Sequence, residues 1–136
     1  MTVLATRTLI SETLPAGVAV RKLTTHRDDR GAFTEVFRRE WNVGVEPVQW
    51  NISKSAPNVL RGLHVHWRHT DYVVVVAGDM WVQLKDLRRR SATADLTCTV
   101  KLSAGDKNAI VFPPRVAHSL YFPVAGSYVI GFTHAY

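Results

Sequence analysis

The chain has 136 residues, of which 46% are hydrophobic, a formal net charge of +6 and one cysteine, Cys98. That length predicts one domain with one core, and a lone cysteine excludes an internal disulfide and a cysteine-based zinc site. The sequence shows no signal peptide and no apolar run long enough to span a membrane, which predicts a cytoplasmic protein that does not bind membranes. The basic excess suits an anionic ligand, but no nucleic-acid-binding motif accompanies it, so nucleic acid is not an expected partner.

Short β-prone segments, separated by turn signals, fill most of the chain. Alternating apolar and polar residues or short apolar runs predict strands, in chain order, at residues 18–23, 32–37, 48–53, 59–66, 71–77, 80–86, 96–102, 108–112, 117–122 and 128–133. Segment 71–77 is apolar enough to be buried on both faces, and 38–44 is expected to be a loop with at most one helical turn. This pattern predicts a single all-β domain over residues 1–136, a sandwich or a barrel.

The apolar residues that alternate along these segments form the predicted core. They are Phe33, Phe37, Ile52, Leu63, Val73, Val75, Trp81, Val82, Leu84, Leu102, Ile110, Phe112, Leu120, Tyr128 and Ile130. A chain of this length buries enough apolar surface to fold without disulfides.

Residues 59–71 hold the densest group of titratable side chains in the sequence. His64 and His66 are two residues apart in a predicted strand, so their side chains are expected on the same face. Asp71 and Gly78 follow, and a second motif downstream consists of Pro113 and the later histidine His118. This spacing resembles the two motifs of the cupins, in which the four polar side chains converge inside a barrel. We therefore predict a cupin barrel, a double-stranded β-helix or jelly roll.

Two kinds of chemistry suit four such side chains. They can move protons without any metal, because an imidazole titrates near neutral pH. They can also bind a metal, in which case the ligands would be His64, His66, Asp71 and His118. Three imidazoles and one carboxylate suit iron, manganese, nickel or zinc.

A narrower resemblance extends over residues 17–118, most of the chain. The matching blocks are Asp28-Asp29-Arg30-Gly31 with the strand that follows, Gln49-Trp50-Asn51-Ile52-Ser53-Lys54-Ser55, Arg61-Gly62-Leu63-His64, residues 86–93, Leu102-Ser103, and Pro113 with Ala117-His118. Together they resemble the dTDP-4-dehydrorhamnose 3,5-epimerases. The stretch from Arg61 to His66 is also similar to the Arg-Gly-x-His-x-His of the sugar-nucleotide 3,4-ketoisomerases.

The resemblance implies a site for a dTDP-4-keto-6-deoxyhexose, with no cofactor. His64 would remove the proton beside the ketone, and His66 and Asp71 complete the catalytic candidates, since the two histidines could pass protons between adjacent carbons. The residues that would hold the substrate are Arg30, Glu35, Gln49, Asn51, Arg61 and His118. The resemblance also implies a homodimer formed through N-terminal strands in residues 1–27, and a role in deoxysugar or cell-surface polysaccharide synthesis, such as that of lipopolysaccharide.

The chain departs from the epimerases at three positions. The lysine that stabilises their enolate falls at Asp71, their acidic tyrosine falls at Gly131, and their C-terminal aspartate falls beyond Tyr136. A metal-dependent cupin and a non-catalytic nucleotide-sugar-binding cupin therefore stay open as alternatives. Asp71 itself could bind a metal, orient a histidine, or form a salt bridge with Arg61 or Arg68, whereas Arg30 and Glu35 could be a structural ion pair.

Overall fold

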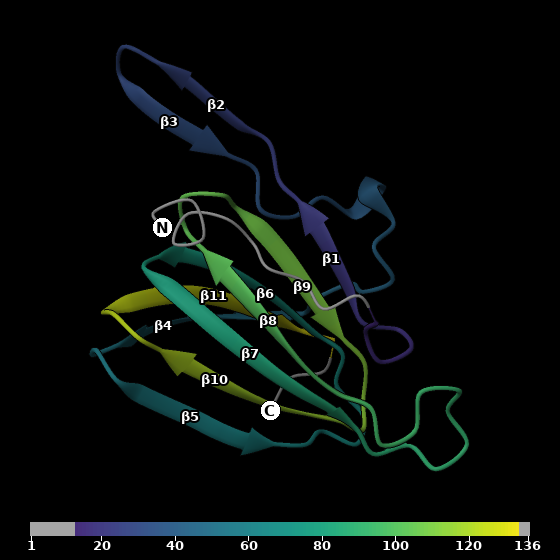
Figure 1. The fold of residues 1–136 in the computed structure, drawn as a ribbon. Helices are drawn as coiled ribbons and strands as arrows, with labels where there is room; N and C mark the ends of the chain where they lie inside the picture. The colour runs from purple at the N-terminus through teal and green to yellow at the C-terminus, as the bar shows by residue number, and fades with distance from the viewer. Residues whose placement is uncertain (1–12, 134–136) are drawn as a thin grey trace.

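The computed structural model describes residues 13–133, which form short strands connected by turns (Figure 1). The strands are β1 Ala19–Lys22, β2 Thr25–Asp28, β3 Gly31–Thr34, β4 Gln49–Ser55, β5 Val59–His64, β6 Asp71–Ala77, β7 Asp79–Asp86, β8 Thr97–Ser103, β9 Asn108–Phe112, β10 Val116–Phe122 and β11 Gly126–Phe132. The one helical element of the described range is the 3-10 turn Arg39–Trp41, inside the predicted loop. No helix in these residues is long and apolar enough to cross a membrane.

Two antiparallel sheets face each other and enclose the core (Figure 1). One sheet has the strand order β1-β9-β6-β11-β4, and the other has the order β5-β10-β7-β8. Consecutive strands such as β4 and β5 belong to different sheets, so the chain crosses repeatedly between them, as in a jelly roll. The predicted all-β cupin barrel is confirmed.

The interior is built by period-two alternation along the strands. On β7, Met80, Val82 and Leu84 point inward and are fully or almost fully buried. They belong to the same hydrophobic cluster as Val73 and Val75 of β6 on the opposite sheet. The two sheets therefore share one core, because each presents its apolar face to the other.

Strand β6 is buried on both faces from Asp71 to Val75, as predicted, whereas Val76 and Ala77 at its end are exposed. Tyr72 and Val74 point away from the barrel interior, but the segment that carries Phe37 and Trp41 packs over them. The Tyr72 hydroxyl donates a hydrogen bond of 2.6 Å to the carbonyl oxygen of Val36, which fastens this segment to the sheet. The second face of β6 is therefore covered by the loop that follows the N-terminal hairpin.

The predicted burial of three core residues is wrong. Phe33 is 63% exposed, Ile52 is 77% exposed and Leu63 is 72% exposed. Phe33 lies on a hairpin outside both sheets, whereas Ile52 and Leu63 lie on edge strands β4 and β5. Alternation shows which residues share a face, but it does not show whether anything covers that face. The confirmed core residues are Val73, Val75, Val82, Leu84, Leu102, Ile110, Phe112, Leu120 and Tyr128, while Phe37, Trp81 and Ile130 are half-buried.

The predicted strand at residues 18–23 is confirmed as β1, and one further N-terminal strand was not predicted. Strand β1 pairs with β9 of its own chain, at the edge of the larger sheet. The unpredicted strand β2 pairs with β3 to form a hairpin that projects from the barrel (Figure 1). The sequence of β2, Thr-His-Arg-Asp, has no apolar alternation, because neither face of the hairpin joins the core. Residues 1–12 of the predicted dimer-forming segment lie outside the described residues.

Candidate active site

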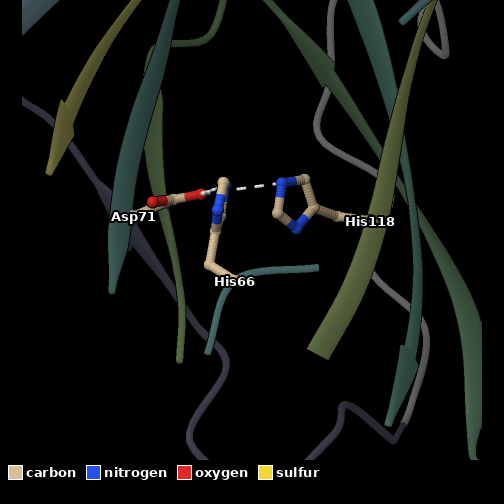
Figure 2. Close-up of side chains that lie close together, drawn as sticks. All are labelled: His66, Asp71 and His118. Carbon is tan, nitrogen blue, oxygen red and sulfur yellow. Dashed lines mark ion pairs between the residues drawn. The ribbon is translucent and has the colours of Figure 1, made fainter. Parts of the chain in front are cut away.

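The predicted polar cluster forms between the two sheets. Asp71 is the first residue of β6, and its inward direction follows from alternation with Val73 and Val75. His118 comes from β10 of the opposite sheet, and His66 comes from the connection between β5 and β6. Figure 2 shows the three side chains pointing toward one another. Residues distant in sequence are thus brought to one place by the fold.

The Asp71 carboxylate is the centre of this cluster. Its Oδ2 lies 3.4 Å from Nε2 of His66 and 3.6 Å from Nε2 of His118 (Figure 2). These distances are longer than ordinary hydrogen bonds, and neither carboxylate oxygen has a hydrogen-bond partner among the described residues. Burial raises the pKa of Asp71 to about 7, because the ionised form has lost its water. Of the alternatives for Asp71, the salt bridges with Arg61 and Arg68 are excluded here.

His118 is held in one orientation by its surroundings. Nδ1 lies 3.3 Å from the carbonyl oxygen of Val116, and the ring packs 4.4 Å from the ring of Phe112, centroid to centroid. Because a carbonyl can only accept, this contact places the ring proton on Nδ1 and leaves the lone pair of Nε2 facing Asp71. Burial lowers the pKa of His118 to about 4, so the ring is neutral near pH 7.

His64 and His66 occupy different depths. His64 ends β5 and is exposed, with its ring centroid 5.8 Å from that of His118 and 6.4 Å from that of His66. His66 is half-buried. Its pKa is lowered mainly by burial and, to a smaller extent, by the neighbouring histidines His69 and His64. Strand β5 ends before His66, so the prediction of one strand through both residues is wrong. Their rings are nevertheless neighbours.

His69 lies in the same connection between β5 and β6 and belongs to the same group of rings. Its centroid lies 5.0 Å from that of His66 and 5.7 Å from that of Phe132. Phe112 and Phe132, which pair with Asp71 from β9 and β11, enclose the carboxylate on either side. Their part in the site follows from sheet pairing, which the sequence alone does not reveal.

Three predicted substrate-binding residues lie on neighbouring strands. Arg61 of β5 donates hydrogen bonds of 2.8 Å to Oγ of Ser55 and to the carbonyl oxygen of Lys54, both at the end of β4. On β4, the Gln49 amide donates to Oδ1 of Asn51 over 3.2 Å, so the two amides share one face as predicted. These groups are anchored on β4 and β5, the strands that lead to His64.

Arg30 and Glu35 do not join the histidines within one chain. Arg30 pairs with Asp28 at 2.6 Å, and Glu35 pairs with Arg38 at 3.7 Å. The possible structural ion pair between Arg30 and Glu35 is therefore contradicted. Arg30 lies in the turn of the projecting hairpin, and Glu35 directly follows β3.

Gly131, where the epimerase tyrosine was expected to fall, points away from the histidines. A Cβ atom at this position would lie 2.8 Å from Cβ of Pro47 and 3.1 Å from the Trp50 ring, on the outer side of the sheet. The inward residues of β11 are its neighbours Ile130 and Phe132 in the pairing with β6. A tyrosine at Gly131 would neither fit nor reach the site.

Comparison with known proteins places this geometry in context. The family described as dTDP-4-dehydrorhamnose 3,5-epimerase matches residues 12–131. The chain is 35% identical to the spore coat polysaccharide biosynthesis protein SpsL of Bacillus subtilis over 102 residues, 75% of this chain and 68% of that protein. It is 38% identical over 99 residues to the dTDP-4-dehydrorhamnose 3,5-epimerase of Shigella flexneri, covering 67% of this chain and only 55% of that enzyme. The chain thus spans about half the length of that relative.

A solved structure shares the whole fold. The dTDP-6-deoxy-D-glucose-3,5-epimerase of Legionella pneumophila, determined in complex with dTDP-4-keto-L-rhamnose, superposes with a TM-score of 0.84 at 28% identity. The superposition covers 96% of this chain and 73% of that enzyme. The similarity therefore includes both sheets and the strands that carry the histidine cluster.

Proposed function

Because this chain belongs to the dTDP-4-dehydrorhamnose 3,5-epimerase family, we propose that it is a sugar-nucleotide epimerase or isomerase of deoxysugar synthesis. Its reaction is proton abstraction beside the ketone of a dTDP-4-keto-6-deoxyhexose. The observation that carries the proposal is the placement of His64, an exposed imidazole at the end of β5 whose ring lies 5.8 Å from the buried ring of His118, centroid to centroid. The similarity to a spore coat polysaccharide protein supports a role in cell-surface polysaccharide synthesis.

His64 is the base in this proposal. A proton α to a ketone is weakly acidic, and a positioned imidazole is a suitable acceptor for it. The exposed ring can meet a sugar that enters from solvent, whereas His118 is almost completely buried behind it. The His66 ring, 6.4 Å from that of His64, is close enough to a bound sugar to serve an adjacent carbon, as a ketone shift would require. Proton transfer between carbon and imidazole itself needs no organic cofactor.

The nucleotide is held by residues of two chains. Arg61 offers its guanidinium to a diphosphate, and Gln49 and Asn51 offer amides from the neighbouring strand. Arg30 and Glu35 are carried away from the histidines by the hairpin, so they serve the site of a second copy in a homodimer. The exposed Phe33 of this hairpin supports that arrangement, because it gains a partner there. The protein acts in the cytoplasm, where nucleotide sugars are made into polysaccharide precursors.

Solvent deuterium exchange tests the reaction directly. The protein is incubated in D₂O with a dTDP-4-keto-6-deoxyhexose, and the sugar is analysed by NMR and mass spectrometry. We expect deuterium at C3 or C5, or a new ketone isomer, and we expect His64→Asn to abolish it while a matched change at the exposed Lys85 of β7 leaves it intact. Absence of exchange and of isomerisation in the wild-type protein would refute the reaction, and a thermal shift with dTDP would then leave a binding protein.

A further inference from the structure

The Asp71 carboxylate lacks the partners that a buried charge requires. Only 1% of the residue is exposed, and neither oxygen accepts a hydrogen bond from any described residue. A buried carboxylate normally accepts several hydrogen bonds or binds a cation, because the loss of water must be compensated. The atoms closest to satisfying it are nitrogens of two imidazoles, from His66 and His118.

The orientation of His118 shows why this ring does not supply the missing hydrogen bond to Asp71. Its Nδ1 faces the carbonyl oxygen of Val116, so Nε2 presents a lone pair to Oδ2 of Asp71. Two acceptors that face each other repel unless a proton on the carboxyl group or a metal ion lies between them. A hydrogen bond from the far ring nitrogen to a backbone carbonyl is also how proteins orient a histidine that binds a metal.

We propose that His66, Asp71 and His118 bind one divalent transition-metal ion through Nε2, Oδ2 and Nε2. The three ligand atoms lie within 4.8 Å of one another, and the two contacts of Oδ2 measure 3.4 Å and 3.6 Å. A tetrahedral ion with ligand bonds of about 2.1 Å sets neighbouring ligand atoms about 3.4 Å apart. The side chains therefore stand near the required spacing before any ion binds (Figure 2).

The ligand set predicts the class of ion. Two imidazoles and one carboxylate suit zinc, iron(II), manganese(II) or nickel(II) rather than calcium or magnesium, which prefer oxygen. Three protein ligands leave at least one coordination position open. His64 is not among the three, although the sequence pattern included it, so His64 keeps its role as the base with the ion bound, whereas His66 can accept a proton at Nε2 only when no ion occupies that nitrogen.

The consequence for catalysis rests on the proposed function. Negative charge develops on the ketone oxygen when the neighbouring proton leaves, and an ionised Asp71 nearby opposes that charge. When bound, the ion supplies a Lewis acid that polarises a carbonyl oxygen. The residues His66, Asp71 and His118 would then hold positive charge beside the base, where without an ion they hold a negative one.

Metal binding is measurable without any enzyme assay. Protein purified without a histidine tag is treated with a chelator and dialysed against Zn²⁺ or Co²⁺, and bound metal is quantified by mass spectrometry. We expect one equivalent per chain, and a visible Co²⁺ spectrum that reports nitrogen and oxygen ligands. Asp71→Asn and His118→Gln should each weaken Zn²⁺ binding by about 100-fold or more, since each removes a direct ligand, whereas effects of 10–100-fold are typical of supporting residues. A matched change, His26→Gln, alters an exposed histidine of the hairpin and should leave the affinity unchanged.

The outcomes separate the two proposals. Less than a tenth of an equivalent in the wild-type protein, or equal Zn²⁺ affinity in the wild-type protein and in Asp71→Asn, would overturn the metal site. If Asp71→Asn does not fold by circular dichroism, His66→Gln and His118→Gln decide in its place. Deuterium exchange that proceeds fully after chelation would remove the metal from catalysis and leave the proposed reaction standing. Stoichiometric metal binding, with no thermal shift by dTDP and no deuterium exchange, would leave the metal site standing and refute the proposed reaction.

Discussion

Asp86 provides the sharpest test of how the barrel is held together. Its side chain is 0% exposed, yet it accepts hydrogen bonds from the backbone and guanidinium of Arg88 and from the hydroxyls of Ser91 and Thr93, at 2.6–3.0 Å. The carboxylate thereby organises the loop between β7 and β8. In Asp86→Asn the amide nitrogen cannot accept, so donors are left facing a donor, and the ion pair with Arg88 is lost.

The expected cost follows from these contacts. Removing one partner of a buried ion pair costs about 3–5 kcal/mol. Arg88 is 25% exposed and can recover some water, so we expect about 3 kcal/mol for Asp86→Asn. With a urea m-value of about 2 kcal/mol/M, the unfolding midpoint should fall by about 1.5 M. Asp29→Asn, an exposed carboxylate in the hairpin turn, serves as the control and should change the free energy of unfolding by less than about 0.5 kcal/mol.

The same carboxylate predicts a pH dependence. Hydrogen bonds from Arg88, Ser91 and Thr93 hold the pKa of Asp86 well below its ordinary value of 3.8. A lowered pKa in the folded state contributes stability that is fully present above pH 3.8 and is lost as the pH falls below it. The difference in unfolding free energy between wild type and Asp86→Asn should therefore be constant from pH 5 to pH 7 and shrink in stronger acid, measured by urea titration. A cost below about 1 kcal/mol at pH 7, or a difference that grows in acid, would refute this account of the loop.

Two further substitutions test the packing. Gly78→Ala forces a side chain onto a residue with φ of +73°, and its Cβ would clash with the carbonyl oxygen of Ala125, so we expect a loss of more than about 2 kcal/mol in urea unfolding. Gly44→Ala has a similar φ of +85° with open space around it, so it measures the backbone strain alone, and an equal loss in both variants would disprove the clash. Tyr72→Phe removes the hydrogen bond to Val36 and should cost about 1 kcal/mol and speed proteolysis of the covering segment, and unchanged cleavage would show that this bond does not secure it.

Local patterns predict the strands well but not what lies against them. Nine or ten strands follow from alternation, and the double burial of β6 follows from its apolar run. The exposure of Phe33, Ile52 and Leu63 could not be predicted, because each looks apolar in sequence and only the assembled sheets show that nothing within residues 13–133 covers them. Strand β2 was missed for the complementary reason, since a hairpin outside the core needs no apolar face.

The block at residues 86–93 illustrates a second limit. In the sequence it is one of the blocks that carry the resemblance to the epimerases. In the structure Arg88, Ser91 and Thr93 all donate to the Asp86 carboxylate, so at least part of the block is a folding motif rather than a ligand site. Residues that distinguish a family can thus serve its architecture, and spacing alone does not separate the two roles.

Asp71 shows what spacing can and cannot decide. Its distance from Gly78 aligned it with cupin motifs. The sequence nevertheless left open whether it would contact a metal, a histidine, Arg61 or Arg68. Its place as the first residue of β6, in phase with Val73 and Val75, turns it inward between Phe112 and Phe132, where its nearest titratable partners are His66 and His118. His118 lies on β10 of the opposite sheet, and the antiparallel register of β10 with β5 places it opposite His64. His118 and His66 therefore both lie next to the exposed His64 and the buried carboxylate, so we expect the proposed proton transfer at His64 and the proposed ion binding at Asp71 to influence each other through these rings.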